Sequence, residues 1–146
     1  MVELLPPPVV ISLTICDGIH TDTFSARNTL LGLFDGFSAD EFPATLPRCC
    51  VYAEITECSE DLSVRVRFAS SDPADEPILE TEPLFAAADS PLRPHSVQWT
   101  ITELEFPRPG VYAVQSVDQH DRVFGERRLF AEGPELETDK EPDDEP

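Results

Sequence analysis

The strongest constraint on the fold is an alternation of apolar and polar residues that recurs along most of the chain. Its clearest example is the run Leu-Ser-Val-Arg-Val-Arg-Phe from Leu62 to Phe68. Successive side chains of a β-strand point to opposite faces, so this period predicts a strand with one buried face. Comparable runs occupy residues 9–16, 50–56, 97–106, 111–117 and 123–131. Since no helical stripe exceeds a few turns, the sequence predicts an all-β fold.

The stretch from residue 28 to residue 44 is apolar on both faces of the strand that it would form. Leu31 and Leu33 would lie on one face, and Leu30 and Phe34 on the other. A strand of this kind needs cover on two sides. We therefore expect it to be the central strand of a layered β domain, ended by the Phe-Pro pair at residues 42–43.

Two hairpins are expected from the spacing of these runs. A short polar loop separates residues 9–16 from the strand that follows, and residues 118–121 separate the last two runs. About eight short strands at regular spacing favour a two-sheet antiparallel sandwich, immunoglobulin-like or C2-like.

Two segments depart from the regular pattern. The apolar phase slips after residue 101, which predicts a bulge near Thr102 and Glu103. Residues 78–87 have a weak pattern, and Pro83 confines them to an edge or an irregular position.

The length of 146 residues and a hydrophobic content of 40% suit a single domain. We expect a proline-rich arm at residues 1–8, the sandwich at 9–131, and a disordered acidic tail at 132–146. The formal net charge of −19 opposes binding to nucleic acid and electrostatic docking on membranes. The partner that such a charge favours is a protein with a basic surface.

The start of the chain lacks a basic residue and a long apolar core, and no segment approaches the length of a membrane span. We therefore expect a cytoplasmic protein whose four cysteines stay reduced. The spacing of Cys16, Cys49, Cys50 and Cys58 matches no zinc-binding or redox motif, so buried thiols are the favoured interpretation. Two disulfide bridges remain the alternative if the protein is exported.

Several groups of turn and core residues together carry a resemblance to a family. They are Ile15-Cys16-Asp17, Leu31-Gly32-Leu33-Phe34-Asp35, Ala39 to Ala44, and Phe106 to Tyr112. On these residues the chain resembles, over residues 9–131, an uncharacterised bacterial family of small β-rich proteins, a domain of unknown function. In that family a Gly-Lys pair usually opens the second strand, whereas this chain has Ala26-Arg27. The resemblance implies a bacterial, soluble, non-secreted protein and supplies no catalytic or binding residue.

The Pro109-Gly110-Val111-Tyr112 run is similar to the entry into a late strand of many immunoglobulin-like sandwiches. Pro109 and Gly110 would set the turn. Tyr112 could bury its ring while its hydroxyl reaches a backbone group.

One possible site is a metal centre at one end of the sandwich. If eight strands simply alternate in direction, four loops that contain all three histidines meet at that end. The candidate ligands are Asp17, His20, Asp22, His95, Asp118, His120 and Asp121, with Glu60, Asp61 and Asp89 beside them. Carboxylates suit Ca²⁺, and histidine with carboxylate suits Zn²⁺. The alternative interpretation is that these acidic loops are solvated turns.

No nucleophile elbow, phosphate-binding glycine loop, His-Glu-x-x-His pair or dinucleotide fingerprint is present, and no cofactor is expected. The leading hypothesis is a non-catalytic protein-interaction module, with strand addition at Ile78–Phe85 as one mode of binding. Metal binding is the second hypothesis, and a hydrolase with dispersed catalytic residues is the third. Surface arginines are expected to pair with nearby acids; these are Arg65, Arg67, Arg127 and Arg128.

Overall fold

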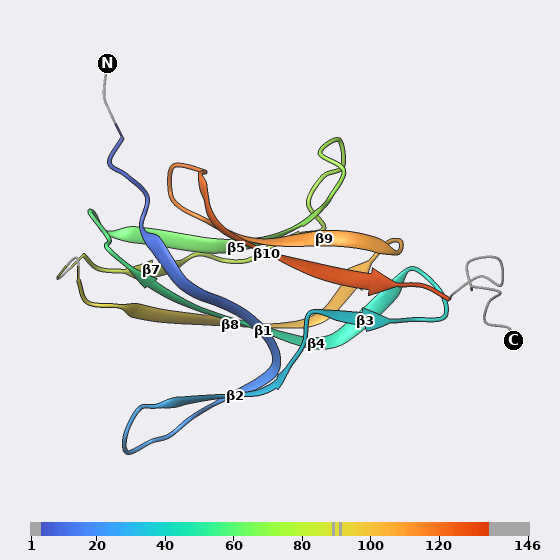
Figure 1. Ribbon diagram of the computed structural model, residues 1–146, viewed down its shortest axis with the longest axis horizontal. Coiled ribbons are helices and arrows are strands. Elements are labelled where there is room, and N and C mark those ends of the chain that lie inside the picture. Colours follow the sequence, from blue (N-terminus) through green and yellow to red (C-terminus); the bar gives the residue numbers. More distant parts are fainter. Residues whose placement is uncertain (1–3, 89, 91, 135–146) are drawn as a thin grey trace, which may run out of the picture.

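A computed structural model describes residues 4–88, 90 and 92–134 of the chain (Figure 1). Ten strands form within these residues. They are β1 (Val9–Thr21), β2 (Asn28–Leu33), β3 (Gly36–Ser38), β4 (Ala44–Thr56), β5 (Leu62–Ser70), β6 (Leu79–Glu80), β7 (Leu84–Ala86), β8 (His95–Phe106), β9 (Gly110–Val117) and β10 (Val123–Glu132). The described residues include no helix of the length and apolar character that crossing a bilayer requires.

The strands form two stacked sheets, which Figure 1 shows as an upper and a lower layer. The four-stranded sheet has the order β2-β1-β4-β8, and the six-stranded sheet has the order β3-β10-β9-β5-β6, with β7 also paired to β5. Every pairing is antiparallel except that of β3 with β10. The predicted all-β, two-sheet sandwich is confirmed.

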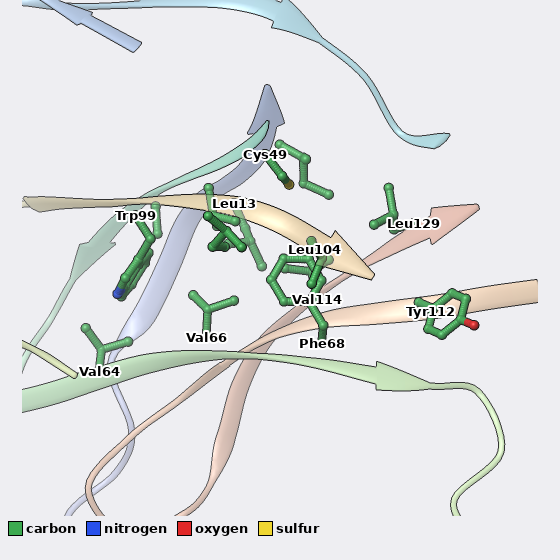
Figure 2. Close-up of a cluster of buried hydrophobic side chains, with 14 of the residues drawn as sticks. Leu13, Cys49, Val64, Val66, Phe68, Trp99, Leu104, Tyr112, Val114 and Leu129 are labelled. Carbon is green, nitrogen blue, oxygen red and sulfur yellow. The ribbon is translucent and has the colours of Figure 1, made fainter. Parts of the chain in front are cut away.

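Alternate side chains of the two sheets fill the space between the layers. In β5 every residue predicted to face inward is buried, and Phe68 meets Phe106 and Leu104 of the opposite sheet within one apolar cluster. Figure 2 shows Phe68 and Leu104, with Val64, Val66 and Trp99, pointing into the gap between the ribbons. This filling is the main contribution to stability, at about 25 cal/mol per Å² of apolar surface that it removes from water.

The prediction of one central strand within residues 28–44 is wrong. They do not form one central strand but two short edge strands, β2 in the four-stranded sheet and β3 in the six-stranded sheet. The chain changes sheets at Phe34 and Asp35, where Phe34 N–H still donates to Ile15 of β1 while the Asp35 carbonyl accepts from Phe130 of β10. The stretch is apolar on both faces because its first part, β2, belongs to one sheet and its second part, β3, belongs to the other. Leu31 and Leu33 of β2 are exposed.

This division and the splitting of residues 78–87 into β6 and β7 account for ten strands where about eight were expected. Both β6 and β7 lie at the edge of the six-stranded sheet, against β5, as the proline predicted. The two expected hairpins, β1–β2 and β9–β10, are confirmed. Most of the predicted acidic tail, residues 135–146, lies outside the described residues.

The phase slip in β8 is present, but it is not a bulge. Glu103 adopts a φ of 55°, in the left-handed region, and the residues that face the core change from Ile101 to Leu104. The register between β8 and β4 nevertheless stays constant on both sides. It does so because β4 slips at the same level, where Pro47 and Arg48 are both exposed between half-buried Leu46 and buried Cys49.

Tyr112 closes the turn that leads into β9. Its ring is only 2% exposed and packs edge-on against Phe106, with ring centroids 5.0 Å apart. Its hydroxyl donates to the Arg108 carbonyl at 2.6 Å. The role expected for Tyr112 is therefore confirmed, and it anchors the β8–β9 turn to the core.

Replacing Tyr112 by phenylalanine should keep the ring packing and leave the Arg108 carbonyl without its donor. We expect a loss of about 1 kcal/mol in the free energy of unfolding, and a melting temperature about 3 °C lower. Thermal and urea denaturation measure both values. Tyr52→Phe is the control, because Tyr52 lies half-buried on the outer face of the four-stranded sheet; equal effects of the two changes would contradict the role of the Tyr112 hydroxyl.

Candidate functional site

The acidic residues of the β9–β10 turn are engaged by neighbouring groups. Asp118, which is 1% exposed, accepts from the backbone N–H groups of His120 and Arg122 and from Arg122 Nε at 2.9 Å. Asp121 is paired with Arg65 and Arg67 of β5. These contacts satisfy the carboxylates within the fold, so both residues stabilise the turn.

The three histidines are not grouped as expected. His120 Nε2 lies 2.9 Å from Glu60 Oε2, whereas His95 begins β8 opposite Ile55. His20 lies on the β1–β2 hairpin, beyond the last residue of β1 that pairs with β4. The strand count explains the difference, because the change of sheets after β2 breaks the simple alternation on which the grouping was based.

The remaining candidates divide between the β1–β2 hairpin and the end of the sandwich where the loops at residues 57–61, 86–88 and 118–121 meet. Asp22 accepts from the backbone of Phe24 and Ser25 and so shapes the tip of the β1–β2 hairpin. Asp61 accepts from Ala88 N–H, Asp17 lies beside Gly32, and Asp89 is outside the described residues. Within the described part of the chain, no three His, Cys, Asp or Glu side chains are placed to hold one metal ion.

All four cysteines are free and buried, as predicted. Cys49 belongs to the core, and burial raises the pKa of its thiol to about 12. Cys50 points to the other face of the sheet, where its thiol contacts the Asp17 carbonyl and the Thr100 hydroxyl. Burial also raises the pKa values of the Cys16 and Cys58 thiols. Thiols with raised pKa values are poor nucleophiles, so Cys16, Cys49 and Cys58 serve packing.

The arginines of β5 form a compact ion-pair network. Arg67 Nε lies 2.8 Å and Arg65 Nε 3.2 Å from the two oxygens of Glu80, and both arginines reach Asp121. These contacts hold the pKa values of Glu80 and Asp121 below their usual range. The expected local pairing is confirmed for these two arginines, whereas Arg127 donates to the Leu13 carbonyl.

A hollow of about 520 Å³ lies on the outer face of the six-stranded sheet, beside this network. Its charged lining residues are Arg67, Asp72, Asp75, Glu126 and Arg128. Both signs occur together and several are already paired, so this hollow has no strong preference for the charge of a ligand.

A second hollow is a better candidate for binding. It is a groove of about 460 Å³ between the outer edges of the two sheets, where β8 lies beside β6. We call it the β6–β8 groove, and its lining residues are Pro43, Ile78, Leu79, Ile101, Thr102, Glu103, Leu104, Glu105 and Pro107. Its volume falls within the range of about 300–1,000 Å³ that is typical of ligand-binding clefts.

Trp99 fixes β8 to the opposite sheet near the β6–β8 groove. Its indole N–H donates to the Glu82 carbonyl at 3.2 Å and so ties β8 to the segment between β6 and β7. The apolar residues that line the groove include Ile78 and Leu79 on one side, and Ile101 and Leu104 of β8.

Two carboxylates border the groove. Glu103 and Glu105 are exposed, and neither has a hydrogen-bond or ion-pair partner among the described residues. The left-handed φ of Glu103 keeps its side chain out of the core while Leu104 turns in. The groove therefore combines an apolar floor with two carboxylates that are free to bind cations.

The sequence carried one signal for this site, the phase slip at Thr102 and Glu103. The closeness of β6 to β8 could not be inferred. The strands β6 and β7 have only two and three residues and flank Pro83, and such short strands show no alternation from which a pairing could be predicted.

Residues 11–123 match the family described as "Family of unknown function (DUF6941)". The matched range extends from β1 to the first residue of β10, so it includes the β6–β8 groove. No curated protein matches the chain.

Binding of Ca²⁺ or Zn²⁺ by Asp17, His20, Asp22, His95, Asp118, His120 or Asp121 stays a prediction. If it occurs, isothermal titration should give a saturable heat with either ion, and the ion should raise the melting temperature. No heat and an unchanged melting temperature with both ions would remove this hypothesis.

Replacing Arg67 by glutamine should lower the melting temperature most at neutral pH. The pKa values of Glu80 and Asp121 are depressed in the folded state, so their pairing contributes fully above the unfolded pKa of about 4. The contribution is lost as the pH falls through the folded values. The difference in melting temperature between wild type and variant should therefore shrink between pH 7 and pH 3.

Arg48→Gln is the control, because exposed Arg48 has no partner among the described residues. Its difference from wild type should not depend on pH in this way. A difference for Arg67→Gln that is constant over the same range would show that the ion pairs contribute nothing.

Proposed function

We propose that this protein, which belongs to the family of unknown function DUF6941, is a non-catalytic interaction module that binds a basic segment of another protein. The observation that carries the proposal is the β6–β8 groove, with its apolar floor and its two unpaired carboxylates. A partner segment would bury an apolar side chain against Leu79 and Leu104, and a neighbouring lysine or arginine would meet Glu103 and Glu105.

The charge of the whole chain supports this choice of partner. A formal net charge of −19 attracts basic surfaces and accelerates their encounter. The groove then supplies what long-range attraction cannot, a specific place for an apolar side chain beside a cation.

The geometry favours docking of side chains over strand addition at Ile78–Phe85. Here β6 and β7 have only two and three residues, and Pro83 between them has no N–H to donate. Ile78 and Thr81 already donate their N–H groups to β5. Few backbone groups of this segment are left for a long added strand.

We further propose that the module acts in the bacterial cytoplasm. Four free, buried cysteines are consistent with a reducing compartment. The resemblance given above supports the bacterial origin.

The proposal is tested with an array of short peptides in which leucine is flanked by lysine or arginine, compared with the same peptides carrying glutamate. We expect binding only of the basic set. Glu103→Lys/Glu105→Lys should weaken this binding by about tenfold or more, which corresponds to about 1.4 kcal/mol.

The matched control is Glu54→Lys/Glu57→Lys, which changes the net charge equally at residues away from the groove. It should retain most of the affinity. Equal weakening by both double variants would mean that only net charge matters, and no binding of basic peptides to wild type would reject the proposal.

A further inference from the structure

Two of the four free cysteines lie outside the apolar core of the sandwich. Cys49 and Cys58 belong to the core cluster, whereas Cys16 and Cys50 do not. The residue before each of the latter two in its strand faces the core, so both point to the outer face of the four-stranded sheet. These two thiols are therefore on the same side of the sheet, and Cys49 is on the other.

Cys16 and Cys50 are directly opposite each other on neighbouring strands. They are the last residue pair between β1 and β4, and both are 0% exposed. The Cα atoms of opposed residues in an antiparallel pair are about 4.5–5.5 Å apart, and a disulfide joins Cα atoms that are about 4.4–6.8 Å apart. The register of the two strands therefore places these cysteines at a separation that a disulfide can bridge.

The two sulfur atoms lie beside the same short segment of β1. Cys16 Sγ donates to the Gly18 carbonyl at 3.4 Å. Cys50 Sγ reaches across to β1 and donates to the Asp17 carbonyl at 3.7 Å. Burial raises the pKa of the Cys16 thiol, and the neighbouring Cys50 raises this pKa further. In the part of the chain that the structure describes, no third layer covers this face of the sheet (Figure 1).

We propose that Cys16 and Cys50 are a redox-sensitive pair, which hydrogen peroxide converts from two thiols into a cross-strand disulfide. The Cys50 thiolate attacks one oxygen of the peroxide and the O–O bond breaks, which leaves a sulfenic acid on the sulfur and releases hydroxide. This hydroxide takes up the proton of the Cys50 thiol and becomes water. The Cys16 sulfur then attacks the Cys50 sulfur, the S–O bond breaks, and the departing hydroxide takes the Cys16 proton as a second water. Both thiols are oxidised, and one peroxide is reduced to water.

The order of the two steps follows from the surroundings of the two sulfurs. Cys50 Sγ lies 3.6 Å from the hydroxyl of Thr100, an exposed residue on the same face, so a small peroxide has a short path to it. Cys16 has a raised pKa, which makes it a poor nucleophile toward a dissolved oxidant. Its attack on the oxidised Cys50 takes place within one molecule, and this proximity offsets the small fraction of thiolate.

The disulfide is of the readily reduced kind. Opposed Cβ atoms in a sheet are about 4.5–5.5 Å apart, whereas a disulfide prefers about 3.8 Å, so the two strands must move closer together to form it. Strained disulfides are more easily reduced and are the regulatory ones. The same thiols are therefore restored when a dithiol reductant replaces the oxidant.

The position of the pair gives the disulfide a structural effect. From Gly18 onward β1 pairs with β2 alone, and Figure 1 shows the β1–β2 hairpin projecting at the lower left, away from both layers. Cys16 lies at the root of this hairpin, and Cys50 lies in the body of the four-stranded sheet. Oxidation fixes the root of the hairpin to β4 by a covalent bond, and reduction releases it.

Thiol counting and peptide mapping of the folded protein test the proposal. Wild type treated with hydrogen peroxide should lose two of its four free thiols, and the peptides that carry Cys16 and Cys50 should become joined. Dithiothreitol should restore all four thiols. Cys58→Ser is the matched control, because this thiol lies in the core cluster, and it should form the same bond.

Cys16→Ser and Cys50→Ser should each prevent the bond. In Cys16→Ser the sulfenic acid on Cys50 has no thiol opposite it and should be trapped by dimedone. Circular dichroism checks the fold of both variants, and the mapping of wild type does not depend on them. Wild type that keeps all four thiols, or that is oxidised only to sulfinic acids, would overturn the proposal. So would a bond that joins any other pair of cysteines.

Discussion

The structure depends on the packing of alternate side chains from two sheets against each other. Phe68 of β5, Phe106 of β8 and Tyr112 of β9 belong to this layer, and all three are buried. Because the strand period is two, each inward side chain obliges its neighbours to face outward. The residues available for function are therefore those at the edges of the sheets, where the alternation no longer determines whether a side chain faces the core or the solvent.

Two edges differ in what they offer. At the β6–β8 groove the apolar floor is bordered by Glu103 and Glu105, and the Trp99–Glu82 hydrogen bond ties β8 to the segment between β6 and β7. At β2 the strand extends past the body of the sandwich with exposed leucines and no net charge. An acidic border suits a basic partner.

Regular alternation made part of this structure predictable. For β5 the pattern alone predicted the strand and its inward face, and for β9 and β10 it predicted the strands, because a half-buried strand alternates apolar and polar residues. The same reasoning failed for residues 28–38. A strand covered on both sides is apolar on both faces, but so is a segment that passes from one sheet to the other, and alternation cannot tell the two apart. That error carried over into the loops, and the grouping of His20, His95 and His120 failed with the strand count. The groove was also beyond reach, because Ile78 and Leu104 are brought together only by the stacking of the sheets.

The matched slip of β4 at Pro47 and β8 at Glu103 has an evolutionary consequence. Both strands change the side that faces the core at one level, and the ladder continues unbroken. Loss of one residue from β8 at this point would turn Leu104 and Phe106 toward water unless β4 lost a residue opposite. Insertions and deletions in related chains should therefore be inherited in pairs at these two sites, so that one lineage keeps both kinks and another keeps neither.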